Sequence, residues 1–386
     1  MVTFTETPGQ APASLPQWLE HQAHRQAKGI ALRHKHLGVW QAWTWDQVAD
    51  EVHRLATALD AHGFTVGATL TILSRPRPQA LLAALAAQWL GGVASLLDPL
   101  EAATGQVNLL QALQPDFVLA EGVEEILRLQ AAQVQPRVLV YLEKRGLGDS
   151  IACDHSLAYT ALLALQPDQA LAAQARAQQT AFVFHRHGAG GVEQQRHSHA
   201  ELLQEGRRLV EREGLGRRDE ALAARAFASG GQARYLLAPW LVAGFRLNFP
   251  ENLATRDRDR RELGPTLVAG TRETYERLHR QVLERLPQTG SWSRKWVDWA
   301  LAPRPGLLQR HLGYWLVRRP LRDVLGFSRT RVPLLVGDAL GPEARAFFDA
   351  LAIEVRQWDD SPPWNVSLTA EDNTPIDWLE CRSLLA

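Results

Sequence analysis

The segment from Phe182 to His199 carries the residues most suited to binding or catalysis. It reads FVFHRHGAGGVEQQRHSH, an apolar run followed by a glycine-rich turn. A strand that enters such a turn can expose several backbone N–H groups, and these groups bind phosphate. At the turn, however, the segment offers Arg186 and histidines, and no serine, threonine or lysine stands before Ser198. The sequence therefore predicts an anion-binding backbone with side chains poorly suited to a polyphosphate.

A metal site is a second hypothesis for the same segment. It contains four histidines, in two pairs spaced i, i+2: His185 with His187, and His197 with His199. This spacing on a strand places both imidazoles of a pair on one face, where they can chelate zinc or nickel. Glu193 is the one acidic residue among them, and no cysteine accompanies them. We keep a His-rich, metal-responsive module as an alternative and assign no metal ligand.

Composition and charge exclude several classes of protein. The chain has 386 residues, of which 46% are hydrophobic and 22% charged, as in folded globular proteins. Its 42 basic and 42 acidic residues balance, so no chain-wide field attracts nucleic acid or an anionic membrane. The two cysteines, Cys153 and Cys381, lie far apart in sequence and form no ligand motif. We therefore expect a cytoplasmic protein without a disulfide framework.

Residues 80–97 are long enough to cross a membrane and need a separate explanation. The stretch is mostly alanine and contains Gly91 and Gly92, a turn signal, so we expect a buried helix followed by a short buried strand. The N-terminal 16 residues lack the basic region and apolar core of a signal peptide. We therefore predict no transmembrane segment and a mature chain that begins near Met1.

The elements that must position the glycine-rich turn alternate between strand and helix patterns. A hairpin is expected over 30–44, and helical spacing follows over 46–63. Short apolar runs typical of strands then recur at intervals: 68–74, 92–96, 117–119 and 181–184. This alternation predicts an α/β fold with mixed, largely parallel sheets. We divide the chain into two stacked αβ subdomains, 1–170 and 171–386, at the Gln/Ala-rich stretch that precedes Ala181.

A region rich in tryptophan and arginine spans residues 290–322. Interleaved aromatic and arginine side chains can bind single-stranded nucleic acid by stacking and phosphate pairing. A helical hairpin with its tryptophans inward and its arginines reaching outward fits the same residues, and the neutral chain offers no supporting basic field. We therefore expect a helical insertion in the second subdomain and no nucleic-acid partner.

Segments along most of the chain resemble the adenylate-forming, or AMP-binding, superfamily, and within it the long-chain fatty acyl-CoA ligases. None is specific alone, but their order and spacing agree with that subgroup: 15–19, 38–52, 247–251, 262–266, 319–329 and 341–348. The resemblance implies the α/β fold of the large N-terminal domain of these enzymes. It also implies the family reaction, in which ATP and Mg²⁺ activate a fatty acid to acyl-AMP and then acyl-CoA.

The resemblance further implies that the glycine-rich turn is a degenerate phosphate loop. The family loop reads Y-T-S-G-T-T-G-x-P-K-G, and its hydroxyls, amides and lysine hold ATP. Here only the glycine skeleton remains, and Gln194 or Gln195 stands at the lysine. Near Val336, the run VGDAL replaces the G-G-A-P-L run of the adenine side. The vestigial nucleotide-binding residues are His185, Arg186, His187, Gly188, Ala189, Gly190, Gly191, Gly337, Asp338 and Ala339.

Other parts of the family machinery are altered. After Gln357 the chain reads WDDSPP, where the family has Y-G-x-T-E, which packs on adenine and supplies a glutamate for Mg²⁺. The sequence ends at Ala386, before the family's ribose-binding aspartate and the mobile C-terminal domain with its adenylation lysine, and no lysine follows Lys295. We therefore expect a truncated, degenerate member with no catalytic residue in place and no cofactor of its own.

The leading functional prediction is a catalytically inactive ligase-like protein. It would bind a long-chain fatty acid or an acyl adenylate, or act as a scaffold for an intact acyl-CoA ligase or another protein. Each lost charge-assisted phosphate contact costs about 1.5–3 kcal/mol, so several lost together weaken ATP binding by orders of magnitude. The alternatives are an active, unusual or split adenylating enzyme that uses Arg186 and the histidines in place of the lost phosphate contacts, the metal-responsive module, and a product without a retained role.

Overall fold

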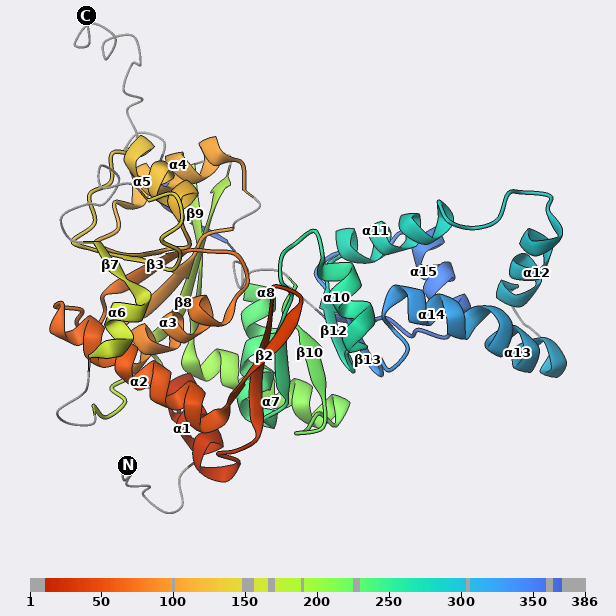
Figure 1. Ribbon diagram of the computed structural model, residues 1–386, viewed down its shortest axis with the longest axis horizontal. Helices are drawn as coiled ribbons and strands as arrows, with labels where there is room; N and C mark the ends of the chain where they lie inside the picture. The colour runs from red at the N-terminus through yellow and green to blue at the C-terminus, as the bar shows by residue number, and fades with distance from the viewer. Residues whose placement is uncertain are drawn as a thin grey trace, which may run out of the picture.

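The computed structural model describes residues 11–98, 101–147, 156–165, 171–188, 191–224, 230–302, 306–358 and 364–369. These residues form two mixed sheets with helices around them, and a helical arm extends from one side (Figure 1). The predicted α/β fold with largely parallel sheets is confirmed.

The eight-stranded sheet has the order β15-β9-β8-β4-β3-β5-β6-β7. From β8 to β7 all neighbouring strands are parallel, whereas β9 is antiparallel to both β8 and β15. Its strands are β3 (Thr69–Leu73), β4 (Val93–Leu96), β5 (Phe117–Ala120), β6 (Val138–Tyr141), β7 (Ser156–Ala158), β8 (Thr180–Gly188), β9 (Gly191–Ser198) and β15 (Asn365–Thr369).

The seven-stranded sheet has the order β14-β13-β12-β10-β11-β1-β2. Only the β1-β2 pair is antiparallel, and it is the hairpin that the sequence predicts over 30–44. The strands are β1 (Ile30–His36), β2 (Val39–Thr44), β10 (Glu220–Leu222), β11 (Arg246–Phe249), β12 (Leu267–Gly270), β13 (Val332–Val336) and β14 (Arg356–Trp358).

Each sheet takes strands from both sides of residue 170. The early strands β1 and β2 join the sheet of β10 to β14, and the later strands β8, β9 and β15 join the sheet of β3 to β7. The division into 1–170 and 171–386 stays a prediction about domains, but the sheets do not separate there. The Gln/Ala-rich composition near residue 170 is a local property of the sequence. Which strands share a sheet depends instead on pairing between segments that lie far apart in the chain.

The main hydrophobic core contains residues from both sheets and from the helices that pack together at Trp45 and Trp240, whose rings stack 4.8 Å apart. Its helices are α1 (Leu15–Arg25), α2 (Trp45–Ala61), α3 (Pro78–Trp89), α6 (Tyr159–Ala164), α7 (His199–Glu213), η1 (Ala233–Leu237) and α9 (Ala238–Ala243). Smaller helical elements are α4 (Ala103–Leu113), α5 (Val123–Ala131), α8 (Gly230–Gln232) and α10 (Arg256–Leu263).

Helix α3 is buried along nearly its whole length, as its mostly apolar sequence requires. The buried strand β4 follows it, so the prediction for residues 80–97 is confirmed. Within the ranges that the structure describes, no helix combines the length and the apolar character needed to span a bilayer.

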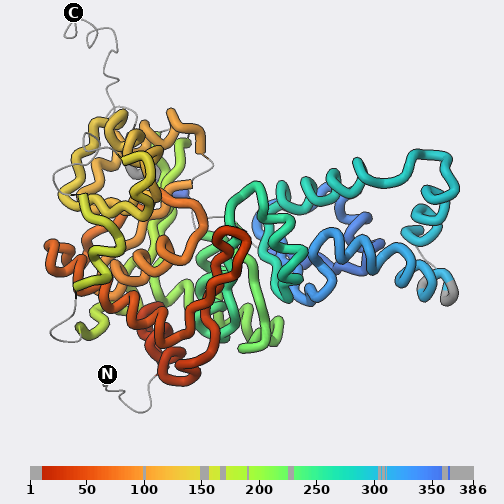
Figure 2. Tube along the Cα trace, in the orientation of Figure 1, coloured from red at the N-terminus to blue at the C-terminus, as the bar shows by residue number. Residues whose placement is uncertain are grey.

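The Trp/Arg-rich region is helical, as predicted, and lies at the end of the arm furthest from the sheets (Figures 1 and 2). The arm consists of α11 (Arg272–Leu283), α12 (Trp292–Leu301), α13 (Leu307–Gly313), η2 (Tyr314–Arg318), α14 (Arg319–Leu325) and α15 (Pro342–Ala350).

In the Trp/Arg-rich region, the prediction that the tryptophans point inward and the arginines outward is wrong. Trp292, Trp296 and Trp315 are 80%, 55% and 50% exposed, whereas Arg318 is buried and donates from Nε to the carbonyl oxygen of Ala300 at 3.1 Å. Ala300 is buried as well, and a Cβ at position 313 would lie only 3.2 Å from its Cβ. Because small residues close this hairpin, it has no room for inward indole rings.

Buried histidines give the core a pH-dependent stability. The backbone N–H of Leu15 donates to Nδ1 of His199 at 3.3 Å, and burial lowers the pKa of His199 to about 4. The unfolded chain binds a proton near pH 6.5 that the folded chain excludes. His199 therefore contributes stability that is present above about pH 6.5 and is lost as pH falls towards 4.

We predict that His199→Asn, which keeps an acceptor near Nδ1 but cannot be protonated, weakens this pH dependence. Between pH 7 and pH 4.5 the variant should lose up to about 3 kcal/mol less unfolding free energy than the wild type. Urea unfolding at the two pH values measures the difference. The matched control is His311→Asn at an exposed position; an equal change in this control would contradict the assignment.

Candidate functional site

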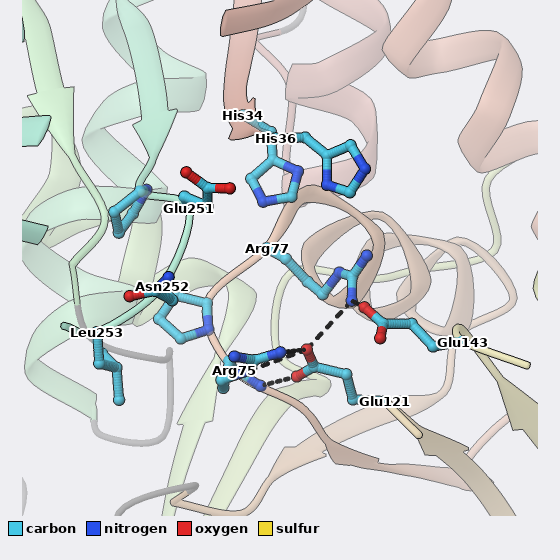
Figure 3. A pocket seen from close by; sticks show the side chains of 11 residues that line it. His34, His36, Arg75, Arg77, Glu121, Glu143, Glu251, Asn252 and Leu253 are labelled. Atoms are coloured by element: carbon cyan, nitrogen blue, oxygen red, sulfur yellow. Dashed lines mark hydrogen bonds and ion pairs between the residues drawn. The ribbon is translucent and has the colours of Figure 1, made fainter. Parts of the chain in front are cut away.

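Strand ends from both sheets meet at one polar cavity. In parallel sheets, ligands bind beyond the carboxyl ends of the strands, where loops are free to diverge. Here the residues after β3, β5, β6 and β11 face the end of β1 (Figure 3). They line a junction pocket of about 130 Å³: His34, His36, Arg75, Pro76, Arg77, Glu121, Glu143, Pro250, Glu251, Asn252 and Leu253.

Glu121 is the centre of the charges in the junction pocket. Its Oε2 accepts from the Arg75 backbone N–H at 2.7 Å, and its Oε1 accepts from Arg75 Nε at 2.9 Å and from Arg77 Nη1 at 3.2 Å. Arg77 also pairs with Glu143 at 2.8 Å. Burial raises the pKa of Glu121, but the hydrogen bond from Arg75 and the charge of Arg77 outweigh burial and hold it below its ordinary value. Both arginines are thus neutralised by neighbouring carboxylates.

His34 adds no cation to this pocket at neutral pH. Burial, together with the charge of Arg77, lowers its pKa to about 4. The junction pocket is therefore a closed ion-pair cluster that joins strand ends, and it offers little attraction to a phosphate. This pocket was not predicted from the sequence, although the run Ser74-Arg75-Pro76-Arg77 directly after an apolar strand was a usable signal.

The predicted phosphate turn lies at the tip of the β8-β9 hairpin. Pairing continues to its end, where Gly188 lies opposite Gly191. Gly191 has φ +123°, a conformation that other residues rarely adopt. The predicted site residues Ala189 and Gly190 lie outside the described residues. Beyond the tip, Gly191 to Gln194 have partners on both sides, β8 and β15.

A capping box ends β9 and begins α7. Ser198 Oγ accepts from the Glu201 N–H at 3.2 Å, and Glu201 accepts from the Ser198 N–H at 2.8 Å. Two of the helix's first donors are satisfied in this way. The hairpin is thus held by the helix at one end and by its own ladder along its length.

Side chains of the turn bind one another. Arg186 Nε donates to Glu193 at 2.8 Å, and its guanidinium lies 4.3 Å from the centre of the Trp364 ring. The His187 Nε2 atom lies 3.1 Å from the carbonyl oxygen of Gly105. Arg186, the arginine at the tip that could replace the missing lysine, therefore already has a carboxylate and an indole as partners.

Glu193 also covers the glycine backbone. Its Oε1 atom lies only 2.1 Å from the place that a Cβ at position 188 would take. A carboxylate therefore lies against Gly188, at the tip where the resemblance implies a phosphate. Two like charges at contact distance repel, so the turn is electrostatically unsuited to a polyphosphate.

The hairpin separates the four histidines instead of gathering them. Residues paired across an antiparallel ladder share a face, and Phe182 pairs with His197 whereas His185 pairs with Gln194. Since side chains alternate along β8, His185 and His187 lie on the face opposite His197. Among the described residues, no group of three or more metal-binding side chains occurs. The hairpin geometry therefore opposes a shared metal site.

His185 lines a larger groove on the open face of the eight-stranded sheet. The groove has a volume of about 590 Å³ and is bordered by β3, β4, β8, β9 and the end of α4. His185 Nδ1 lies 3.2 Å from Ser95 Oγ, and burial, with the charge of Arg196, lowers its pKa to about 4. His185 is therefore neutral at pH 7 and is not a cationic phosphate ligand.

The remaining predicted residues follow β13. Gly337 donates its N–H to the carbonyl oxygen of Trp358 at 3.0 Å and accepts from Gln357 Nε2 at 3.0 Å. Asp338 and Ala339 are exposed. Six residue steps separate Trp358 from Trp364, which contacts Arg186, so these two points lie within about 22 Å. The segment predicted to replace Y-G-x-T-E falls largely outside the described residues.

Comparison with known proteins gives a consistent family assignment. The family model described as AMP-binding enzyme matches residues 19–358. No curated protein matches the chain. Among solved structures, the chain is similar to acetoacetyl-CoA synthetase from Streptomyces lividans, with a TM-score of 0.65 and 18% identity, over 90% of this chain and 50% of that one.

Two further structures show the same fold. A putative long-chain-fatty-acid CoA ligase from Rhodopseudomonas palustris has a TM-score of 0.64 and 16% identity, over 89% of this chain and 74% of that one. The A domain of a carboxylic acid reductase from Segniliparus rugosus, in complex with AMP and a co-purified carboxylic acid, has a TM-score of 0.67 and 14% identity, over 91% and 60%. The chain thus spans 50% to 74% of these structures.

We predict that Glu121→Gln destabilises the fold by about 2 kcal/mol, because it leaves Arg75 and Arg77 without their shared carboxylate; partial exposure of Arg75 limits the loss. The more exposed Glu143, changed to glutamine, is the matched control and should cost less than about 1 kcal/mol. Denaturant unfolding at pH 7 compares them. Equal losses in the two variants would show that Glu121 is not the centre of the cluster.

Proposed function

Because the chain belongs to the AMP-binding enzyme family, we propose that it is a long-chain acyl-CoA ligase-like protein that does not adenylate a fatty acid. In its place we propose a binding role, with a fatty acyl group or an acyl adenylate as ligand, or a scaffold role towards an intact ligase or another protein. A cytoplasmic location belongs to the same proposal and rests on cysteine usage alone.

The observation that carries this proposal is the carboxylate at the glycine turn. Adenylation requires preorganised donors and cations where charge develops on the phosphates. At this turn, Glu193 lies against Gly188 and neutralises Arg186. Neutralisation of Arg186 and the added negative charge of Glu193 both weaken phosphate binding.

The residues around the turn do not fit the ATP and Mg²⁺ of the family reaction. His185 is neutral at pH 7, and the amides of Gly191 to Gln194 lie in a strand that is paired on both sides. The described hairpin contains no lysine, and its hydroxyl-bearing residues Thr180 and Ser198 stand at its far end from the tip. We therefore derive no phosphate chemistry at this turn.

One observation favours an active, unusual or split enzyme as the second candidate. Arg186 is about half exposed, and exposed ion pairs contribute at most about 1 kcal/mol. A phosphate could therefore draw Arg186 away from Glu193 at small cost. This candidate requires that the rest of the family machinery come from residues beyond those described or from another chain.

We predict that a non-hydrolysable long-chain acyl-adenylate mimic binds with a micromolar Kd, and that ATP with Mg²⁺ binds far more weakly. Calorimetric titration compares the mimic, ATP with Mg²⁺ and the free fatty acid. Fatty-acid-dependent exchange of pyrophosphate into ATP should stay at background. Exchange above background would overturn the inactive assignment in favour of the second candidate, whereas no binding of any of the three would remove the ligand-binding role and leave the scaffold.

We further predict that Glu193→Gln increases the affinity for ATP with Mg²⁺. The substitution removes a negative charge from the turn and releases Arg186, effects worth on the order of 1 kcal/mol together, or several-fold to tenfold in Kd. Displacement of a fluorescent ATP analogue measures the change. Glu211→Gln, on the exposed side of α7, is the matched control. An unchanged affinity in Glu193→Gln would mean that the carboxylate is not the obstacle.

A further inference from the structure

The end of the arm exposes a set of large apolar side chains. Five of them define the arm-tip surface: Trp292, Trp296, Leu312, Trp315 and Leu316. They come from two helical segments, α12 and the continuous run of α13 and η2, which pack against each other at the point of the arm furthest from the sheets (Figures 1 and 2). Such a set on a projecting element marks an interaction surface.

The aromatic residues of α12 form one stripe. Trp292, Trp296 and Trp299 are spaced i, i+4 and i+7, so they lie on one face of the helix. The rings of Trp296 and Trp299 meet edge to face, 5.5 Å apart. On the other side of the helix, Arg294 pairs with Asp298 at 2.8 Å. The helix therefore has an apolar face and a charged face, and the apolar one is turned outward.

The second helical segment also exposes apolar side chains. Leu312, Trp315 and Leu316 follow each other at i, i+3 and i+4 and are all exposed. The contact between Ala300 and Gly313 closes the space between the two segments. The arm-tip side chains therefore cannot turn inward without opening this contact.

The arm tip is also strongly basic, although the whole chain is neutral. Residues 290–322 contain one acidic residue, Asp298, and seven basic ones: Arg294, Lys295, Arg304, Arg310, Arg318, Arg319 and Arg322. This segment thus has a net charge of +6, and the rest of the chain has −6. Two of the cations lie directly beside exposed indoles, Lys295 over Trp292 at 5.3 Å and Arg319 over Trp315 at 4.6 Å.

We propose that the arm tip docks on a lipid bilayer that contains anionic headgroups. Tryptophan is suited to the interface, because its ring is apolar and its N–H reaches water, and exposed leucines bury in the acyl region beside it. Each cation near an anionic leaflet contributes about 1 kcal/mol. The arm lies on such a surface and does not span it, and neutrality of the whole chain excludes only a chain-wide field.

Two other occupants fit the residues less well. Single-stranded nucleic acid would stack on the tryptophans and pair with the arginines, but it has no use for exposed Leu312 and Leu316. A second copy of residues 290–322 would bring a net charge of +6 towards the first, and this repulsion opposes self-association. A bilayer uses the tryptophans, the leucines and the cations together.

The test is sedimentation of the full chain with vesicles. We expect binding to phosphatidylcholine vesicles that contain about one-third phosphatidylglycerol, at least tenfold weaker binding to pure phosphatidylcholine, and loss of binding at high salt. Brominated acyl chains should quench tryptophan emission of the unmodified protein, which reports insertion without any substitution.

Two variants locate the contact. The triple variant Trp292→Ser, Trp296→Ser and Trp315→Ser should weaken vesicle binding at least tenfold, and Lys295→Glu with Arg319→Glu should abolish the preference for anionic lipid. The control is Leu37→Ser with Val39→Ser, which removes exposed apolar side chains in the β1-β2 turn and should leave binding unchanged. Circular dichroism verifies that each variant is folded.

Three results would overturn the proposal. They are absence of binding and quenching with both kinds of vesicle, unchanged binding in the triple variant, and equal loss in the Leu37/Val39 control. Binding of single-stranded oligonucleotide, or self-association in analytical ultracentrifugation, that needs the same tryptophans while vesicles do not bind would assign the arm tip to that other partner.

Discussion

The continuous ladder between β8 and β9 determines what the glycine-rich turn can bind. In an antiparallel pair, every second residue directs its N–H to the partner strand. Here the pairing extends to Gly188 and Gly191, and β15 takes the outer side of β9. The same register sends His185 to the sheet-face groove and His197 to the core. Anion binding and metal binding at this hairpin are thus opposed by one feature, the pairing of its backbone.

The charges of the molecule follow a related pattern, because most cations near the strand ends already have carboxylate partners. Arg75 and Arg77 share Glu121 in the junction pocket, and Arg186 pairs with Glu193 at the turn. The fold of an adenylate-forming domain is thus combined with ion pairs that occupy these arginines. A net positive charge is instead concentrated at the arm tip, where cations lie beside exposed indoles.

Sequence patterns predicted the elements of this fold better than their partners. The alternation of apolar runs and helical spacing identified the parallel sheets, and the alanine-rich stretch identified α3 and β4, because these features depend on local periodicity. The strand that enters the glycine-rich turn was also identified from its apolar residues, whereas the vestigial nucleotide-binding role of the turn stays a prediction. The junction pocket was not identified, since it depends on which strand ends meet. The outward tryptophans were missed because Ala300 and Gly313, two small residues, decide which face packs.

The exchange of strands between the two sheets has a consequence for the integrity of the chain. A single break near residue 170 would give two fragments, and each would carry strands of both sheets. The fragments would share two separate parallel ladders, β1 with β11 and β4 with β8. Neither fragment completes a sheet alone, so the two halves of a nicked molecule stay joined by these backbone pairs.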